Sequence, residues 1–407
     1  MYLDLNTSYK YKMEFAKRVR WLEDTSMVEA FDHQDMPGMI SFAAGIPSAE
    51  TYPLDRIRES FDRVIIEHGK QALSYCSTLG YLGLREIMSE RMKNKFGIEY
   101  GTDEIIMTSG SQQGLDMSGM AFIDPGDVVL FESPSYLGAV SALHSYQASL
   151  VGVPTDEEGL TIEGVREALE KYGDKVRLIY VNPDFQNPTG RSWSDNRRRD
   201  FMEFISEYDI PVLEDAAYGE LAFNEVPQKP LAYYDKKGQV IYVGTFSKIF
   251  CPGMRVAWLC ARNRIMEKYL VIKSAADLSS STISQWEIAD FLKHNDIEKH
   301  IEGITSLYSH RCDVMADGIK KYLPGEVTFR KPEGGIFIWL SLPEGKDARI
   351  LYKKACDAGV AFIPGTSFYP NADVHNELRL NFSNTTDEES DRGLKILGRV
   401  TEEFLSE

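Results

Sequence analysis

Short apolar runs rich in β-branched residues alternate with longer stretches of helical period through the middle of the chain. The runs are Ile105–Thr108, Val128–Phe131, Leu178–Val181, Val212–Glu214, Ile241–Val243 and Val256–Cys260. Ile162–Tyr172 and Asp195–Tyr208 are examples of the helical stretches between them. Buried strands that alternate with helices predict βαβ units, a mainly parallel sheet and an α/β protein. Ligands of such sheets bind at the carboxyl ends of the strands.

The pattern changes near Thr282. A helical period continues from there to Tyr322 and predicts one long helix that links two domains. Beyond it the sequence predicts a strand at Gly335–Leu340, a helix at Ala348–Ala358, and strands at Val360–Ile363 and Leu378–Phe382. This order is typical of a smaller α+β domain.

Composition and charge exclude several function classes. The 407 residues are 43% hydrophobic, as in ordinary globular proteins, and carry a formal net charge of −17. A surface that acidic repels phosphate backbones and anionic lipids, so we expect no nucleic-acid partner and no membrane partner. No apolar run resembles a secretory signal or approaches the roughly 18 residues of a membrane span, which favours a cytoplasmic location. The histidines show no metal-ligand spacing, and we expect no metal site.

Lys248 and Asp215 follow two of the predicted strands. A lysine that is partly removed from water has a lowered pKa and is suited to Schiff-base chemistry with a carbonyl group. Asp215 could pair with a ring nitrogen and keep it protonated, and Tyr218 could donate its hydroxyl to an oxygen on the same ring. Alone, Lys248 fits a surface lysine and Asp215 fits a strand-end cap. The combination makes those ordinary explanations improbable.

Two sequence features suit a phosphate group. Arg255 lies in a turn with Pro252 and Gly253, and an arginine at such a turn is a natural phosphate clamp, although a surface ion pair would explain it singly. The segment Thr108–Gly114 follows a strand and opens a helix, where backbone N–H groups and the Ser111 hydroxyl favour an anion. We find neither a G-x-G-x-x-G fingerprint nor a Walker A loop, which speaks against dinucleotide enzymes and P-loop nucleotidases.

Three further side chains could contact a flat cofactor or an acidic substrate. Asn187 lies in an irregular loop after Leu178–Val181 and could donate its amide to a ring oxygen. Tyr136 could stack on a ring, although ordinary core packing explains it equally well when it is taken alone. Arg379 interrupts an apolar strand, and a buried arginine needs an anion such as an α-carboxylate. An arginine on the solvent face of that strand is the alternative.

Taken together, these residues resemble a known family. The motifs N-P-T-G at 187–190, D-x-x-Y at 215–218 and S-K-x-x-x-P-G-x-R at 247–255 resemble the fold-type I pyridoxal-phosphate enzymes of aminotransferase class I/II. The segments 41–47 and 109–113 are similar to the subgroup of 2-aminoadipate and kynurenine aminotransferases. The regulators of the MocR type contain the same domain. The resemblance implies a large domain with a mainly parallel seven-stranded sheet flanked by helices, plus a smaller α+β domain.

The resemblance also implies domain boundaries and residue roles. An N-terminal segment, 1–48, would pack on the small domain and active site, with the large cofactor domain over 49–295 and the small domain over 296–407. Lys248 would form the aldimine with pyridoxal 5′-phosphate, Asp215 would pair with its pyridine nitrogen, Tyr218 and Asn187 would bond its O3′ oxygen, and Tyr136 would stack on the ring. The phosphate would be bound by Ser111, Gln112, Thr245, Ser247 and Arg255.

The substrate side follows from the same resemblance. Arg379 would hold the substrate carboxylate, with help from Asn187 and the Gly45 backbone. Tyr75 resembles a tyrosine that reaches a neighbouring subunit's phosphate, which implies a homodimer with shared active sites. Val28 falls where 2-aminoadipate members carry an arginine, so we expect an apolar or aromatic amino acid as substrate. The expected reaction is ping-pong transamination with a 2-oxo acid such as 2-oxoglutarate.

Other functions remain on the same scaffold. A lyase, a synthase or an amino-acid oxidase would keep Lys248, Asp215 and Arg255, so the cofactor residues do not distinguish these reactions. A ligand-sensing regulator would need an N-terminal DNA-binding segment, but only about 40 residues precede the matching core and the chain is acidic. A non-catalytic homologue conflicts with the intact cofactor residues.

Overall fold

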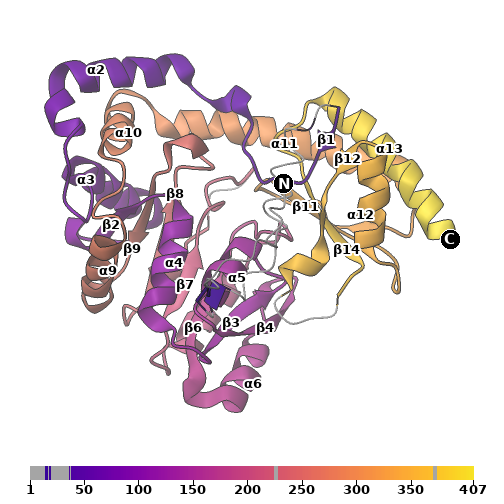
Figure 1. Ribbon diagram of the computed structural model, residues 1–407, viewed down its shortest axis with the longest axis horizontal. Helices are drawn as coiled ribbons and strands as arrows, with labels where there is room; N and C mark the ends of the chain where they lie inside the picture. The colour runs from indigo at the N-terminus through magenta and orange to yellow at the C-terminus, as the bar shows by residue number, and fades with distance from the viewer. Residues whose placement is uncertain (1–13, 17, 20–35, 37, 224–227, 370–373) are drawn as a thin grey trace, which may run out of the picture.

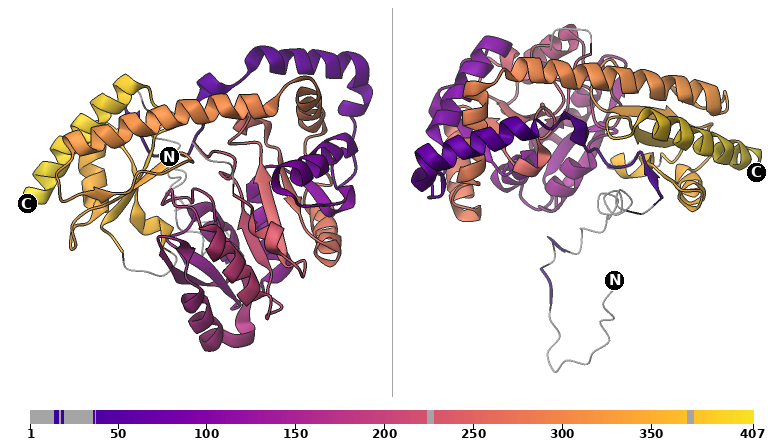
Figure 2. Two further views of the ribbon diagram at one scale, coloured as in Figure 1. Left: turned by 180° about the vertical axis from the view of Figure 1, so that it is seen from behind. Right: turned by 90° about the horizontal axis from the view of Figure 1, so that it is seen from above.

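The computed structural model describes residues 14–16, 18–19, 36, 38–223, 228–369 and 374–407. A large sheet covered by helices and a smaller sheet lie side by side, and the long helix α11 (Ile297–Tyr322) runs past both of them (Figures 1 and 2). The expected α/β architecture is confirmed. In this part of the chain, none of the helices has the length and apolar character needed to cross a membrane.

In the described residues the large sheet has eight strands, in the order β2-β9-β8-β7-β6-β3-β4-β5. Parallel pairing joins β4, β3, β6, β7 and β8, whereas β9 lies antiparallel between β8 and β2. The seven expected strands gain an eighth because β5 is a two-residue hairpin partner of β4. The strands are β2 (Ile105–Thr108), β3 (Val128–Ser133), β4 (Ser149–Asp156), β5 (Gly159–Leu160), β6 (Val176–Val181), β7 (Val212–Asp215), β8 (Val240–Thr245) and β9 (Ala257–Cys260).

Burial explains which strands the sequence predicts. Every residue of β2, β7, β8 and β9 is buried, so each of these strands contains a short run of apolar residues that is not broken by exposed positions. β4 mixes exposed and buried positions, and its apolar pattern is too weak to mark it as a core strand. Thr108, Asp215 and Thr245 end three of the buried strands and place polar groups at one edge of the sheet.

Helices flank the large sheet (Figure 1). The predicted helix at 162–172 has the expected bounds, and the one predicted from Asp195 ends at Ile205, three residues early. The helices of this part are α2 (Leu54–Ala72), α3 (Leu82–Arg91), α4 (Ser111–Phe122), α5 (Leu137–His144), α6 (Ile162–Tyr172), α7 (Asp195–Ile205), α8 (Leu231–Tyr234), α9 (Asn263–Ala276) and α10 (Thr282–His294).

The prediction of one helix from Thr282 to Tyr322 was wrong. The structure has two helices, α10 and α11, with a break at Asn295 and Asp296, which adopt extended backbone angles. The Asp296 side chain accepts a hydrogen bond from the Lys299 N–H and caps the start of α11. In a helical pattern of apolar residues, a polar residue can be an N-cap or can lie on the exposed face of an uninterrupted helix. The sequence pattern does not distinguish the two, so it did not predict the break.

The smaller sheet has the order β10-β11-β14-β13, all antiparallel. A separate two-stranded pair joins β1 from the N-terminal part to β12 in parallel. The strand predicted at 360–363 is therefore two short strands. The expected domain boundaries at 48/49 and 295/296 stay predictions. The elements here are β1 (Ile40–Ser41), β10 (Thr328–Phe329), β11 (Phe337–Ser341), α12 (Ala348–Asp357), β12 (Val360–Ala361), β13 (Ile363–Pro364), β14 (Glu377–Asn381) and α13 (Asp387–Ser406).

Candidate active site

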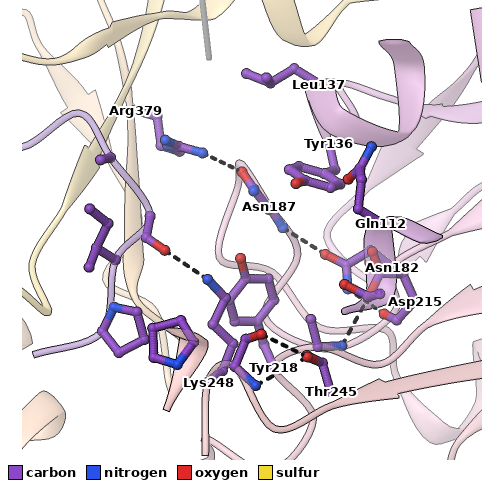
Figure 3. Close-up of a pocket in the computed structure, with 18 of the residues that line it drawn as sticks. Gln112, Tyr136, Leu137, Asn182, Asn187, Asp215, Tyr218, Thr245, Lys248 and Arg379 are labelled. Atoms are coloured by element: carbon purple, nitrogen blue, oxygen red, sulfur yellow. Dashed lines mark hydrogen bonds between the residues drawn. The ribbon is translucent and has the colours of Figure 1, made fainter. Parts of the chain in front are cut away.

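A cavity of about 550 Å³ lies where the carboxyl ends of the large sheet's parallel strands face the smaller sheet (Figure 3). This is the edge at which ligands of parallel sheets bind. Among the residues that the structure describes, the lining brings together every expected site residue except Tyr75. These residues are Gly45, Ser111, Gln112, Tyr136, Asn187, Asp215, Tyr218, Thr245, Ser247, Lys248, Arg255 and Arg379.

Lys248 follows the end of β8 and directs its amine into the cavity (Figure 3). Its Nζ donates a hydrogen bond of 2.7 Å to the Gly45 carbonyl and lies 5.8 Å from the centre of the Tyr218 ring. Burial lowers the pKa of Lys248 to about 8; the charge of Arg379 adds to the effect, while Asp215 opposes it. The side chain is therefore an amine that can lose its proton near neutral pH.

Gly45 allows this contact because it comes very close to the smaller sheet. A Cβ atom at Gly45 would lie 2.8 Å from Phe337 Cζ, so with a larger residue either the Phe337 ring or the backbone that accepts the Lys248 hydrogen bond would have to move. Gly45 follows β1, so the N-terminal part of the chain supplies one wall of the cavity.

Asp215 ends β7 and is 4% exposed. Its Oδ2 accepts a 2.9 Å hydrogen bond from the Tyr180 hydroxyl, and its Oδ1 accepts one from the Ala217 N–H. Burial raises the pKa of Asp215 to about 6, and the two hydrogen bonds and Lys248 act in the opposite direction. A buried carboxylate of this kind favours a cationic N–H group as its remaining partner.

The part of the cavity lined by Thr245, Ser247 and Arg255 has groups that suit an anion. Thr245 Oγ1 donates to Ser247 Oγ over 3.0 Å and accepts from the Ser247 N–H, which fixes both hydroxyl-bearing side chains at the end of β8. Arg255 has a left-handed backbone, with φ at +53°, and its Nη2 donates to the Ser109 carbonyl. A Cβ atom at Gly110 would lie 2.2 Å from Arg255 Nη2, so the guanidinium packs directly on the loop that opens α4.

Arg379 is buried, at 3% exposed, which decides against a place on the solvent face of β14. Its Nη1 donates to Asn187 Oδ1 over 2.7 Å and its Nη2 donates to the Ala43 carbonyl over 2.6 Å. Its Nε is buried and meets no acceptor among the described residues. Burial lowers the pKa of Arg379 to about 10. Because Arg379 lines the cavity, a carboxylate entering it could bind this guanidinium.

Tyr136 forms an aromatic wall of the cavity and also packs against buried apolar side chains of the core. It follows β3, caps the start of α5, and remains partly exposed to the cavity opposite Asn187 (Figure 3). Burial raises the pKa of its hydroxyl to about 12, so the ring is neutral at ordinary pH. Its flat face can therefore stack on a planar ligand.

Two residues of the site were missed from the sequence. Asn182 donates from Nδ2 to the Asp215 carbonyl over 2.6 Å, and its Oδ1 accepts from the Asn187 N–H over 2.8 Å, so it ties β7 to the N-P-T-G loop. Its position at the start of that loop was the available signal. Tyr180, the partner of Asp215, is the other, and its hydroxyl within an apolar strand was the only sign of it.

Of the other two expected site residues, one lies away from the cavity and the other is not described. Tyr75 follows α2, is 89% exposed and does not line this cavity. Val28 lies outside the described residues.

Comparisons with known proteins agree with this geometry. The family model "Aminotransferase class I and II" matches residues 37–397. An aromatic-amino-acid aminotransferase of Thermococcus litoralis is 37% identical over 97% of this chain and 95% of its own, and a 2-aminoadipate transaminase of Thermus thermophilus is 33% identical over 96% and 97%. The solved kynurenine aminotransferase of Pyrococcus horikoshii superposes with a TM-score of 0.91 at 36% identity, covering 96% of this chain and 97% of that one.

Proposed function

The chain belongs to the aminotransferases of class I and II, and from that premise we propose a specific reaction. The enzyme moves the amino group of an L-α-amino acid with an apolar or aromatic side chain to a 2-oxo acid such as 2-oxoglutarate. Its cofactor is pyridoxal 5′-phosphate. The observation that carries the proposal is one cavity that holds an amine of lowered pKa, a buried carboxylate and a buried arginine with a free donor. A cytoplasmic location is part of the proposal.

The cavity fits the cofactor at three points. Among the residues that line the cavity, Lys248 would hold it covalently through Nζ, Asp215 would face its ring N–H, and Arg255 would bind its phosphate with Ser111, Gln112, Thr245 and Ser247. Tyr218 and Asn187 would donate to its phenolic oxygen, and Tyr136 would stack on the face of its ring; all three line the cavity. Bound pyridoxal 5′-phosphate supplies a ring that withdraws electrons from the substrate α-carbon.

The chain's own residues supply the acid–base and positioning chemistry. Lys248, once its amine is free, removes the proton from the substrate α-carbon, and its lowered pKa makes the neutral amine available near pH 8. Arg379 binds the substrate carboxylate through its guanidinium, and Asn187 and the Gly45 carbonyl hold Arg379 and Lys248 in place. The same residues then act in reverse on the second substrate, so the kinetics are ping-pong.

The side-chain preference rests on the lining of the cavity. Among the described lining residues, the cations are Lys248, Arg255 and Arg379, and each already has a role with the cofactor or the α-carboxylate. The remaining walls are largely apolar, with Ile46, Pro47, Leu137 and Ile363. An apolar or aromatic side chain suits such walls better than a second carboxylate does. Relatives that act on aromatic amino acids and on kynurenine support this preference.

We propose a homodimer in which Tyr75 reaches the phosphate of the other subunit. Its neighbour Leu73 is 71% exposed, and a surface hollow joins Ser77 and Thr78, just after Tyr75, to Val271 of α9, which is 67% exposed. Exposed apolar groups of this kind are typical of a surface that a second copy covers. The expected sharing of active sites depends on this arrangement.

An amino-acid panel tests the reaction and its substrate class. The holoenzyme is given 2-oxoglutarate and each amino acid in turn, and glutamate formation is measured. We expect leucine, methionine or phenylalanine to exceed 2-aminoadipate. A strong preference for 2-aminoadipate would overturn the side-chain assignment, and ammonia with peroxide and no glutamate would establish an oxidase instead. The same assay with Lys248→Ala should show no turnover, while Lys268→Ala, an exposed lysine of α9, should behave as the unmodified enzyme.

A further inference from the structure

A second lysine, Lys273 in α9, is completely buried. Its side chain has no exposed surface, and the residue is among the largest fully buried ones of the described chain. A buried ammonium is costly unless each of its three N–H donors finds a partner. Burial lowers the pKa of Lys273, and Asp277 opposes that shift. Lys273 is therefore a buried charged residue to which the proposed mechanism gives no role.

Every donor of the Lys273 ammonium is used. Nζ lies 2.8 and 2.9 Å from the two carboxylate oxygens of Asp277, 2.8 Å from Ser280 Oγ and 3.1 Å from Gln113 Oε1. The chain turns sharply between Asp277 and Ser280, because Leu278 has a left-handed backbone conformation with φ at +62°. That turn brings Ser280 back to the lysine.

The partners of Lys273 also hold the loop that opens α4. Gln113 Oε1 accepts from the Ser109 N–H over 2.8 Å, and Ser109 Oγ donates to Ser280 Oγ over 3.0 Å. The Ser109 carbonyl accepts from Arg255 Nη2 over 3.3 Å. The backbone N–H, the side chain and the carbonyl of Ser109 are thus fixed together, and Arg255 is held against the same residue.

A purely stabilising role explains this arrangement poorly. Replacing a buried ion pair with apolar side chains of similar size is often neutral or stabilising. Here the ion pair and its directional hydrogen bonds fix the orientation of the loop that carries Ser111 and Gln112 into the cavity.

We propose that Lys273 is a positioning residue that sets the enzyme's affinity for the phosphate group of its cofactor. With Asp277, Ser280 and Gln113 it orients Ser109, and through Ser109 it aligns the α4 N-terminus and Arg255 around the phosphate. Lys273 itself is fully enclosed and acts only through these neighbours. The inference rests on the proposed function, since it concerns the phosphate of pyridoxal 5′-phosphate.

The test compares a ligand that has the phosphate with one that lacks it. The full chain is stripped of cofactor and titrated with pyridoxal 5′-phosphate and, separately, with pyridoxal. For Lys273→Met we expect the dissociation constant for pyridoxal 5′-phosphate to rise about tenfold, the scale of one charge-assisted hydrogen bond, and that for pyridoxal to change less than about twofold. Lys268→Met, on the same helix but exposed, should leave both constants unchanged.

Equal losses for the two ligands would show a general structural defect and overturn the inference, as would an unchanged affinity for pyridoxal 5′-phosphate. If Lys273→Met does not fold, Ser280→Ala decides, because it removes only a hydroxyl and should weaken the phosphorylated ligand selectively by about threefold. Failure of the unmodified protein to bind pyridoxal 5′-phosphate would contradict the proposed function itself, and it would be visible before any variant is made.

Discussion

The hydroxyl of Tyr180 donates a 2.9 Å hydrogen bond to Oδ2 of Asp215, across the pairing of β6 with β7. Both side chains are buried, and Tyr180 has no exposed surface. Because Ala217 N–H occupies the other oxygen, the carboxylate is held by two donors before any ligand enters. Donors of this kind stabilise the ionised form, which is the form that can pair with a ring N–H.

Tyr180→Phe should therefore shift the pH profile of the enzyme. Burial raises the pKa of Asp215 to about 6, and the hydrogen bond from the Tyr180 hydroxyl is one of the contacts that lower this pKa. Without that hydroxyl the pKa of Asp215 rises, so the carboxylate is protonated at higher pH. We expect the acid limb of kcat/KM to move up by about one unit, with activity at pH 6 falling more than activity at pH 8.

Tyr172→Phe, at the end of α6 and away from the cavity, is the matched control and should leave the profile unmoved. A uniform loss across the pH range in Tyr180→Phe would indicate a packing defect and contradict the electrostatic role.

The parts of the fold that the sequence predicts are those buried on both faces. β2, β7, β8 and β9 are buried along their whole length and contain short apolar runs because both faces of the sheet are covered, whereas β4 mixes exposed and buried positions. The break between α10 and α11 was missed for a different reason. Asp296 caps α11 through its own side chain, and no regular change of hydrophobic period marks that event.

The sequence predicts those site residues that lie at or just after the carboxyl end of a strand. Asp215 ends β7, Lys248 and Asn187 follow β8 and β6, and parallel strands bring their carboxyl ends to one edge of the sheet. Tyr180 lies inside its strand, and the face to which it points depends on a register that one sequence does not reveal. The buried Lys273 is similar, since its partners come from α4 and from the loop after α9.

Arg379→Lys should weaken substrate binding and leave the cofactor in place. Lysine keeps the charge but loses the fork that contacts Asn187, Ala43 and an incoming carboxylate together. We expect KM for the amino acid to rise between tenfold and about a hundredfold, while the visible absorption of the holoenzyme stays unchanged. Steady-state kinetics measure KM, and a visible spectrum of each preparation measures the absorption of the bound cofactor. Loss of the absorption band would place Arg379 with the cofactor instead.

Removing the charge of Lys248 should stabilise the cofactor-free protein at neutral pH. Its pKa in the folded state is about 8, below its ordinary value of 10.5, so the unfolded chain binds the proton more tightly between these values. Folding therefore carries a penalty that is full below pH 8 and fades as the pH rises toward 10.5. Cofactor-free Lys248→Met should unfold at a temperature a few degrees above that of the unmodified protein at pH 7.

The difference should shrink at pH 10, because the other titrating groups are common to both proteins and cancel in the comparison. A stability gain that is the same at both pH values would assign it to packing rather than to charge. Thermal unfolding at pH 7 and pH 10, followed by circular dichroism, distinguishes the two.

Mixing two inactive variants tests whether the active sites are shared between subunits. Lys248→Ala destroys the site of its own chain, and in the proposed homodimer Tyr75→Ala damages the site of the other chain. A mixed dimer then contains one site in which both residues are intact and one in which both are lost. Random reassociation of equal amounts makes half of the dimers mixed, so we expect about a quarter of the activity of the unmodified enzyme to return. An equal mixture of Lys248→Ala and Lys268→Ala should keep half of the full activity whether or not the chains exchange, so it shows whether the mixing procedure itself costs activity. If Tyr75→Ala alone retains full activity, or if mixing restores none, Tyr75 does not serve the neighbouring site.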